Sequence, residues 1–336
     1  MENKKILITG GAGFIGSHAV KLFLEQGYQV TVFDNFFRGF HQVLETLKPL
    51  GDLQVVEGDL RNFDQIDQAL CGQNFAGVLH FAALCLVNES MEQPELYFRN
   101  NVGGTLNLLE AMYKNGVKKL IFSSTCAVYG DSQYLPMDEK HPTNPLNPYG
   151  ESKLIAEKMI KWYGELHGLR HAVMRYFNVC GAASDGLIGD SKKPSQLLMQ
   201  NAVRGAMKIA PFSYTCPQVD TPDGTPIRDY IDVEDLVAAH LAAYERLDDD
   251  QVSGQVFNLS NGKGFSVKEI VSQVEKAFQV EIEKVPSEPR KGEYAEVFAI
   301  PAKAREKLSW QARKSLADSI ESMRKWYTAH PQGWEN

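Results

Sequence analysis

The 336-residue sequence predicts an α/β protein with a doubly wound parallel sheet and a smaller mixed α/β unit. Short apolar, β-rich runs recur along the first two thirds of the chain, and helical segments separate them. Runs of this kind are typical of parallel strands that helices cover on both faces. The rhythm breaks after Asn178, and this change predicts the second unit.

The expected elements follow from this alternation. Strands are predicted over residues 5–8, 29–33, 53–56, 78–81, 120–122, 172–176, 229–231 and 256–259. Helices are predicted over residues 14–26 and 233–247. The Ser266-x-x-Glu269 pattern is a capping box that predicts a third helix, ending near Phe278. Residues 181–227 carry many Gly, Pro, Ser and Asp, so an irregular segment is expected there.

Composition narrows the class of protein. The formal net charge of −7 argues against a broad surface for nucleic acid or anionic membrane. No stretch approaches the roughly 20 apolar residues of a membrane span, and the first apolar run is too short for a secretory signal. The cysteines are odd in number and widely spaced, which predicts reduced thiols, no metal site and a cytoplasmic protein. They are Cys71, Cys85, Cys126, Cys180 and Cys216.

A glycine-rich turn joins the first expected strand to the first expected helix. Its sequence over residues 9–16 is Thr-Gly-Gly-Ala-Gly-Phe-Ile-Gly, with Gly10, Gly13 and Gly16 in the dinucleotide-binding spacing. Such glycines permit a tight turn and let the backbone approach a pyrophosphate, whose charge the helix N-terminus stabilises. The pattern therefore predicts a Rossmann-type unit.

Two carboxylates follow in the positions that such a unit requires. Asp34 ends the second strand, where it can accept hydrogen bonds from an adenosine ribose and would repel a 2′-phosphate. NAD is therefore favoured over NADP, although Arg38 lies nearby in the sequence. Asp59 follows the third strand, where it can reach the adenine or simply close a turn. We expect residues 1–179 with 229–263 to bind NAD, and residues 180–228 with 264–336 to bind the substrate.

A possible acid–base group follows the fifth strand. Tyr149 and Lys153 lie one helical turn apart, and a neighbouring cation favours the phenolate of a tyrosine. Lys153 and a positively charged nicotinamide could together lower the pKa of Tyr149 towards neutrality. Thr125 stands at the carboxyl end of the strand, where its hydroxyl can bind a substrate oxygen, and Ser124 is the alternative. An ordinary amphipathic helix and a strand-end cap are the competing interpretations.

Together these motifs resemble the extended short-chain dehydrogenase/reductase family, and within it the nucleotide-sugar epimerases. The resemblance spans nearly the whole chain. It rests on residues 9–16, Asp34-Asn35, His80-Phe81-Ala82-Ala83, Ser-Ser-Thr-Cys-Ala-Val-Tyr-Gly at 123–130, Pro-Tyr-Gly-Glu-Ser-Lys at 148–153, Arg-Tyr-Phe-Asn at 175–178, Asp-Gly-Thr-Pro-Ile-Arg-Asp-Tyr-Ile at 223–231 and His-Pro-Gln-Gly-Trp at 330–334.

The resemblance implies a role for each matching position. Thr125, Tyr149 and Lys153 match the catalytic residues. The matching cofactor positions, beside the three glycines, are Phe14, Ile15, Asp34, Asn35, Asp59, Leu60, Phe81, Ala82, Ala83, Asn100, Tyr149, Lys153 and Phe177. The matching substrate positions are Thr125, Asn178, Arg228 and Arg290, and both arginines suit a pyrophosphate.

The implied activity is reversible epimerisation at C4 of a UDP-hexose, UDP-glucose to UDP-galactose, through a transient 4-keto sugar with NAD held throughout. Another nucleotide sugar, namely UDP-N-acetylglucosamine, a UDP-uronate or a UDP-pentose, stays open because Leu197 departs from the family pattern in a loop that touches the sugar. A dehydratase of this family needs an acidic residue directly after the strand-end threonine, and Cys126 and Ala127 stand there instead, which argues against dehydration. A non-catalytic NAD-sensing protein is the alternative from another class. The resemblance further implies a homodimer through the helices near 95–115 and 149–167.

One further position concerns the size of the sugar. The resemblance places Val297 where a family residue limits the space around the sugar's 2-substituent. Valine leaves room for an N-acetyl group that a tyrosine would exclude, so we expect UDP-N-acetylglucosamine to be accepted as well. The competing interpretation is that Val297 is a core residue of a short strand.

Overall fold

Seven parallel strands form the central sheet of the computed structural model, which describes residues 4–192, 195–214, 219–286 and 295–334. Their order across the sheet is β3-β2-β1-β4-β5-β6-β10. The strands are β1 (Lys5–Thr9), β2 (Gln29–Asp34), β3 (Leu53–Glu57), β4 (Gly77–His80), β5 (Lys119–Ser123), β6 (Arg170–Tyr176) and β10 (Gln255–Leu259). The predicted strands of this sheet are confirmed, with ends that differ by one or two residues.

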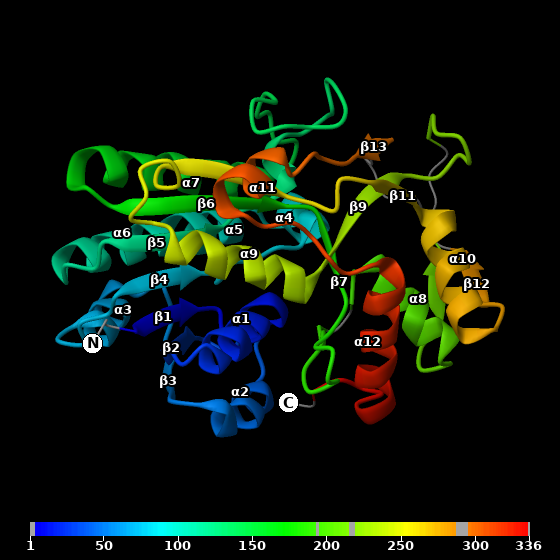
Figure 1. Cartoon of the computed structure of the whole chain (residues 1–336), viewed down its shortest axis with the longest axis horizontal. Helices are drawn as coiled ribbons and strands as arrows, with labels where there is room; N and C mark the ends of the chain where they lie inside the picture. Colours follow the sequence, from blue (N-terminus) through cyan, green and yellow to red (C-terminus); the bar gives the residue numbers. More distant parts are fainter. Residues whose placement is uncertain (1–3, 193–194, 215–218, 287–294, 335–336) are drawn as a thin grey trace.

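Helices cover both faces of this sheet, as Figure 1 shows. On one face lie α1 (Phe14–Glu25), α2 (His41–Leu47), α9 (Val233–Glu245) and α11 (Ala302–Leu308). On the other lie α3 (Phe63–Leu70), α6 (Gly104–Lys114) and α7 (Pro148–His167). The predicted doubly wound α/β class is therefore confirmed. The strand order reverses between β1 and β4, so their carboxyl ends flank the crevice where such sheets bind ligands.

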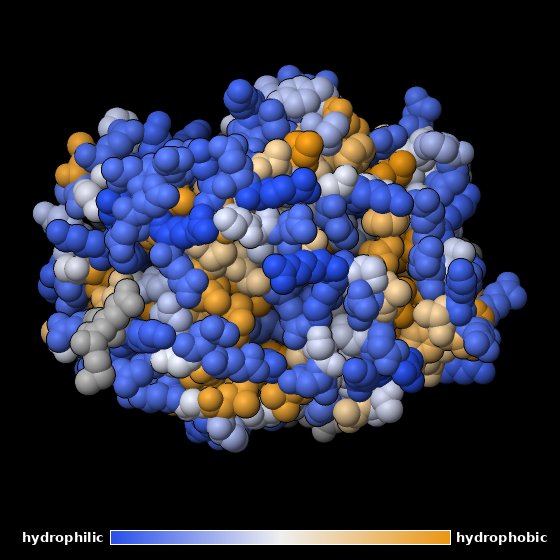
Figure 2. All heavy atoms as spheres, viewed as in Figure 1, coloured by the Kyte–Doolittle hydropathy of each residue, from blue (hydrophilic) through white to orange (hydrophobic). Residues whose placement is uncertain are grey.

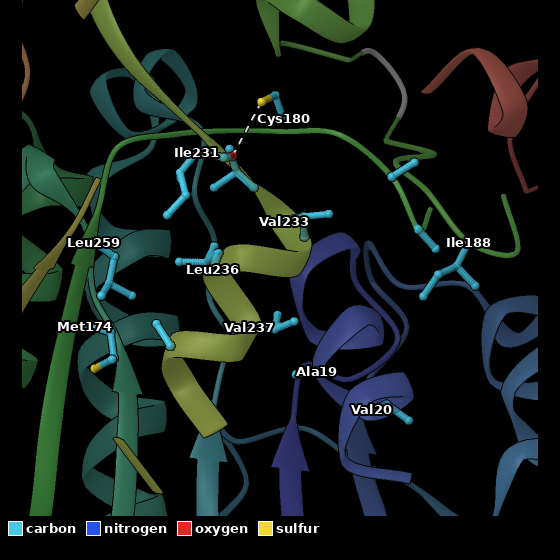
Figure 3. Close-up of a cluster of buried hydrophobic side chains, with 14 of the residues drawn as sticks. Ala19, Val20, Met174, Cys180, Ile188, Ile231, Val233, Leu236, Val237 and Leu259 are labelled. Carbon is cyan, nitrogen blue, oxygen red and sulfur yellow. Dashed lines mark hydrogen bonds between the residues drawn. The ribbon is translucent and has the colours of Figure 1, made fainter. Parts of the chain in front are cut away.

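The larger hydrophobic core fills the space between the sheet and the α1–α9 layer. Ala19 and Val20 of α1 belong to the same buried cluster as Leu236 and Val237 of α9 (Figure 3). Leu259 of β10 lies in this cluster too, so the last strand of the sheet is fixed by the same apolar contacts. Burial of a valine or leucine side chain contributes roughly 1.5–3 kcal/mol.

A second, mixed sheet extends from the end of β6. In it β9 (Ile227–Asp232) pairs in parallel with β7 (Asn178–Cys180) and β13 (Glu296–Val297), and antiparallel with β11 (Gly264–Ser266). A separate parallel pair joins β8 (Phe212–Tyr214) to β12 (Lys284–Pro286). Three helices pack together beside these strands (Figure 1): α8 (Leu198–Ala206), α10 (Val267–Phe278) and α12 (Leu316–Ala329).

The sequence prediction fails in part of this second unit. Residues 181–227 were expected to be irregular, yet they contain α8 and β8. The cap of α8 explains the failure, because its N-cap Leu197 has no side-chain hydrogen bond to mark the start of the helix. By contrast, the capping box of Ser266 and Glu269 is confirmed at the start of α10.

Shorter elements connect the main ones. They are α4 (Val87–Glu92), α5 (Pro94–Tyr97), a π-helical turn (Phe98–Gly103) that leads into α6, and 3₁₀ turns at Lys48–Leu50 and Cys126–Val128. The face in Figure 2 is mostly polar, with apolar residues scattered over it. Among the described residues, every helix is too short or too polar to cross a bilayer.

Candidate active site

A cavity of about 440 Å³ opens at the carboxyl ends of the central strands. Most of the predicted site residues line it, although they come from separate elements. These are Gly10, Gly13, Phe14, Ile15, Gly16, Asp34, Asn35, Asp59, Leu60, Phe81, Ala82, Ala83, Asn100, Thr125, Tyr149, Lys153, Phe177 and Asn178. The volume lies within the range of small-molecule sites.

The glycine turn between β1 and α1 forms one wall of the cavity. Gly10 has a φ of +73°, and a Cβ there would lie 2.5 Å from the nitrogen of Ala82. A Cβ at Gly16 would collide with the carbonyl of Gly10. Gly13 is the N-cap of α1 and makes no side-chain cap, so the amides of the first turn are left for an anion. This backbone cradle fits the pyrophosphate of a dinucleotide.

Asp34 lies at the end of β2 beside this turn. Its carboxylate accepts hydrogen bonds from the nitrogens of Ala12 at 3.0 Å and Phe36 at 2.9 Å, which fix its orientation. Burial raises the pKa of Asp34, and these backbone donors oppose that effect. The position fits the ribose-binding role that the sequence predicts.

Asp59 lines the cavity and also closes a turn, so both interpretations of this residue fit the structure. The side chain of Arg61 hydrogen bonds to it and lowers its pKa to about 2. Asn35 Nδ2 donates to the same carboxylate at 3.1 Å. A carboxylate held in this way is an acceptor for an adenine amine at the outer end of the cavity.

The structure distinguishes the roles of Thr125 and Ser124. Thr125 lines the cavity, and its Oγ1 caps the 3₁₀ turn by accepting from the nitrogen of Ala127 at 3.2 Å. Ser124 is fully buried and donates to Glu157 Oε1 at 2.5 Å. Glu157 in turn forms a buried ion pair with Arg175. Ser124 thus belongs to the support beneath the site, and Thr125 presents its hydroxyl to the cavity.

Tyr149 and Lys153 lie in the first turns of α7, which Asn147 caps by accepting from the nitrogen of Gly150 at 2.9 Å. Lys153 Nζ donates to the carbonyl of Ser123 at 2.8 Å. Burial lowers the pKa of Lys153 to about 8. Burial also raises the pKa of Tyr149 well above its ordinary value, and a hydrogen bond with Thr125 acts in the opposite direction.

This result differs from the sequence-based expectation that Lys153 helps to lower the pKa of Tyr149. The effect of burial dominates because both side chains are largely withdrawn from solvent. Any lowering of the tyrosine pKa therefore depends on ligands that carry positive charge into the cavity.

The predicted substrate residues are placed less uniformly. Asn178 begins β7 and lines the cavity. Arg228 lies outside the lining and donates to the carbonyl of Ile227 at 2.8 Å, but its charge acts on Cys126, which does line it. Val297 is buried in a small core that includes Phe177. Arg290 lies outside the described residues.

Several lining residues were missed by the sequence analysis. Gly189, Asp190, Ser191 and Lys192 reach the cavity from the segment that was expected to be irregular. Trp334 lines it from the far end of the chain, and its nitrogen donates to Ser191 Oγ at 3.0 Å. Only long-range packing brings these residues to the site. The terminal His-Pro-Gln-Gly-Trp motif was the one available indication for Trp334.

The parallel sheet carries a glycine cradle at its switch point, and Thr125, Tyr149 and Lys153 lie at the same edge of the sheet. These features define a dinucleotide-dependent enzyme that interconverts alcohols and carbonyl compounds. The model of the NAD dependent epimerase/dehydratase family matches residues 6–260, and the chain belongs to this family.

Known proteins resemble the chain over nearly its whole length. It is 42% identical to a UDP-glucose 4-epimerase of Halalkalibacterium halodurans, over 98% of this chain and 97% of that protein. It is 40% identical to a putative UDP-arabinose 4-epimerase of Arabidopsis thaliana, over 98% of this chain and 78% of that protein. A UDP-glucose 4-epimerase from Bifidobacterium longum, solved with NAD+ and UDP, superposes with a TM-score of 0.92 at 35% identity, covering 98% of this chain and 100% of that one.

Proposed function

We propose that the chain interconverts UDP-glucose and UDP-galactose by epimerisation at C4, with NAD bound throughout the cycle. The observation that carries the proposal is the position of Tyr149, Thr125 and Lys153 in the cavity that the glycine cradle lines. A sugar hydroxyl in this cavity can meet a proton acceptor beside a dinucleotide. The two relatives described above, each matching 98% of the chain, are a UDP-glucose 4-epimerase and a putative UDP-arabinose 4-epimerase.

The residues of the chain divide the work of the reaction. Tyr149 takes the proton from the 4-hydroxyl and later returns it to the 4-keto sugar. Thr125 donates to the same sugar oxygen and orients it. Lys153, held by the carbonyl of Ser123, lies one helical turn from Tyr149 on the same helix, and the positive charge that favours the phenolate would come from the bound nicotinamide. When bound, NAD supplies the hydride acceptor and donor at C4. Since hydride leaves and returns, the reaction needs no second redox partner.

The cofactor assignment rests on Asp34 and on the backbone cradle. The buried carboxylate of Asp34 would repel the 2′-phosphate of NADP but accepts from a 2′-hydroxyl. Of the residues that would bind the substrate, Asn178 contacts the sugar nucleotide, and Arg228 and Arg290 bind its pyrophosphate.

Val297 is proposed to set how much space surrounds the sugar's 2-substituent. Val297 does not line the cavity but belongs to the same small core as Phe177, which does line it, so its influence on the sugar site would act through Phe177. A valine there leaves room for an acetamido group, and we therefore include UDP-N-acetylglucosamine among the substrates. UDP-pentose is the second candidate, because a putative UDP-arabinose 4-epimerase is 40% identical to the chain.

The proposal extends to the organisation of the enzyme. Residues 1–179 with 229–263 form the NAD-binding domain, and residues 180–228 with 264–336 form the sugar-nucleotide domain.

The protein acts in the cytoplasm as a homodimer, paired through α6 and α7. These helices carry exposed apolar side chains, including Trp162 at 60% and Leu166 at 68% exposure. Light scattering of the wild type and of Trp162→Asp tests the pairing.

A substrate panel tests the proposed activity. Purified protein is incubated with UDP-glucose, UDP-N-acetylglucosamine, a UDP-uronate and a UDP-pentose, and the products are identified by NMR. Its bound nucleotide is released by denaturation and identified by chromatography. We expect stoichiometric NAD and formation of UDP-galactose. NAD-loaded protein without product from any of these sugars would indicate a non-catalytic NAD-binding protein instead, and bound NADP would contradict the role of Asp34.

A further inference from the structure

The cavity contains an ammonium group that the proposed mechanism does not use. Lys192 lines the cavity from the segment after β7, and its Nζ donates to Cys85 Sγ at 3.4 Å. Cys85 lies in the loop after β4, 107 positions away in the sequence. The contact therefore joins the two walls of the cavity, one from each proposed domain.

The backbone that carries Lys192 is anchored from the C-terminal end of the chain. Trp326 Nε1 donates to the carbonyl of Asp190 at 3.2 Å, and Gly189 packs against the ring of Trp326. The nitrogen of Trp334 donates to Ser191 Oγ. With Asp190 and Ser191 buried, Lys192 extends from a fixed base.

The charges in the cavity indicate what Lys192 can bind. Among the described lining residues, the cationic side chains are Arg38, Lys153 and Lys192. Arg38 donates to both carboxylate oxygens of Glu89 at 2.6 Å. Lys153 is held at the catalytic end by the carbonyl of Ser123. Lys192 is held by a thiol, which is a weak hydrogen-bond acceptor that an anionic oxygen can readily replace.

The charges around Lys192 keep it protonated. Electrostatic attraction to Cys85 raises the pKa of Lys192, burial opposes this, and Asp190 adds to the increase. Arg38, which follows β2, also acts on this lysine, and the lysine's partner Cys85 acts on Tyr149 and Lys153 at the catalytic end of the cavity. The glycine cradle and Lys192 line the same cavity, so a dianionic pyrophosphate bound on the cradle would share that space with this ammonium group.

We propose that Lys192 binds the pyrophosphate of the dinucleotide, exchanging Cys85 Sγ for a phosphate oxygen and so holding the cofactor between the two walls of the cavity. This inference rests on the proposed function, because it assumes that the cavity holds NAD. The side chain acts as a retaining residue that slows the release of the dinucleotide. The substrate carries a diphosphate too, and the experiment separates these two sources.

The test measures retention of NAD in the intact protein. Wild type and Lys192→Met are loaded with NAD, and release is followed after transfer to nucleotide-free buffer. Loss of one charge-assisted hydrogen bond predicts release about 10- to 100-fold faster in Lys192→Met. Raising the salt concentration should accelerate release from wild type more than from the variant, because the variant lacks the ammonium group.

Two controls isolate the phosphate contact. Lys325→Met removes a lysine that also binds the 181–192 segment, through the carbonyl of Ser184 at 3.0 Å, but does not line the cavity. It should release NAD like wild type. Cys85→Ala removes the thiol partner but leaves the ammonium group free to bind phosphate, so its release should stay within about threefold of wild type, well below the effect of losing a charged hydrogen bond.

Three outcomes would overturn the inference. Equal release from wild type and Lys192→Met would show that the lysine does not retain the cofactor. Equally fast release of NAD from Cys85→Ala and Lys192→Met would show that the contact between Lys192 and Cys85 retains the cofactor, and not a contact between Lys192 and phosphate. Unchanged NAD release with weakened UDP binding in Lys192→Met would assign the lysine to the substrate diphosphate. If wild type holds no NAD at all, the cofactor part of the proposed function fails first.

Discussion

Asp229 allows a quantitative prediction about stability and pH. It lies in β9 beside Arg228, is fully buried, and accepts from the nitrogen of Asn261 at 2.8 Å. Burial raises its pKa to about 7, although backbone donors oppose this effect. An unfolded chain has an ordinary aspartate pKa of about 4. The folded state therefore holds its proton more tightly, and stability must fall as the pH rises between these two values.

The size of the effect follows from that difference. Stability should fall by up to about 1.4 kcal/mol for each pH unit between about 5 and 7, and by less near pH 7 where Asp229 is half ionised, so wild type loses roughly 2 kcal/mol over this interval. Asp229→Asn is neutral at every pH and should lack this component. Urea unfolding of both proteins, with saturating NAD, measures the free energy of unfolding at each pH. Asp232, whose pKa burial raises to about 6, contributes equally to both proteins and cancels in the comparison. Parallel pH profiles for the two proteins would refute the reasoning.

Four further substitutions test the site. Tyr149→Phe keeps the packing of the ring but removes the transferable proton, so turnover should fall by about 10²–10⁴-fold while bound NAD is retained; a loss below tenfold would assign the base elsewhere. Thr125→Ala should lower kcat with little change in stability, whereas Ser124→Ala should mainly reduce stability because Glu157 loses a buried donor; the reverse pattern would exchange their roles. Val297→Tyr should abolish activity on UDP-N-acetylglucosamine and spare UDP-glucose, and absence of the acetylated activity in wild type would end that hypothesis.

The sequence predicts the parts of the fold that local patterns determine. The strand, glycine turn and helix around residues 5–25 can be recognised because apolar periodicity, glycine spacing and Asp34 agree. The capping box at Ser266 is equally local. The helix α8 was missed because Leu197 provides no cap and the surrounding composition is typical of loops. The three-residue strand β7 depends on its pairing with β9, which no local pattern specifies.

The candidate site shows the same division. Glycines, Tyr149 and Lys153 lie in short motifs whose spacing already implies a shared position. Lys192 and Cys85 meet only through the packing of the C-terminal helix against the segment after β7. The direction of the pKa shift of Tyr149 could not be predicted from the sequence either, because it depends on how deeply the folded chain buries this side chain.

In the proposed reaction, hydride leaves C4 of the sugar and returns to the same carbon. UDP-glucose carrying deuterium at C4 tests this most directly when it is incubated with the purified enzyme in ordinary water. We expect UDP-galactose that retains deuterium at C4, as read by NMR and mass spectrometry, without any added redox partner. Loss of the deuterium to solvent, or unchanged UDP-glucose in the presence of NAD-loaded enzyme, would contradict it.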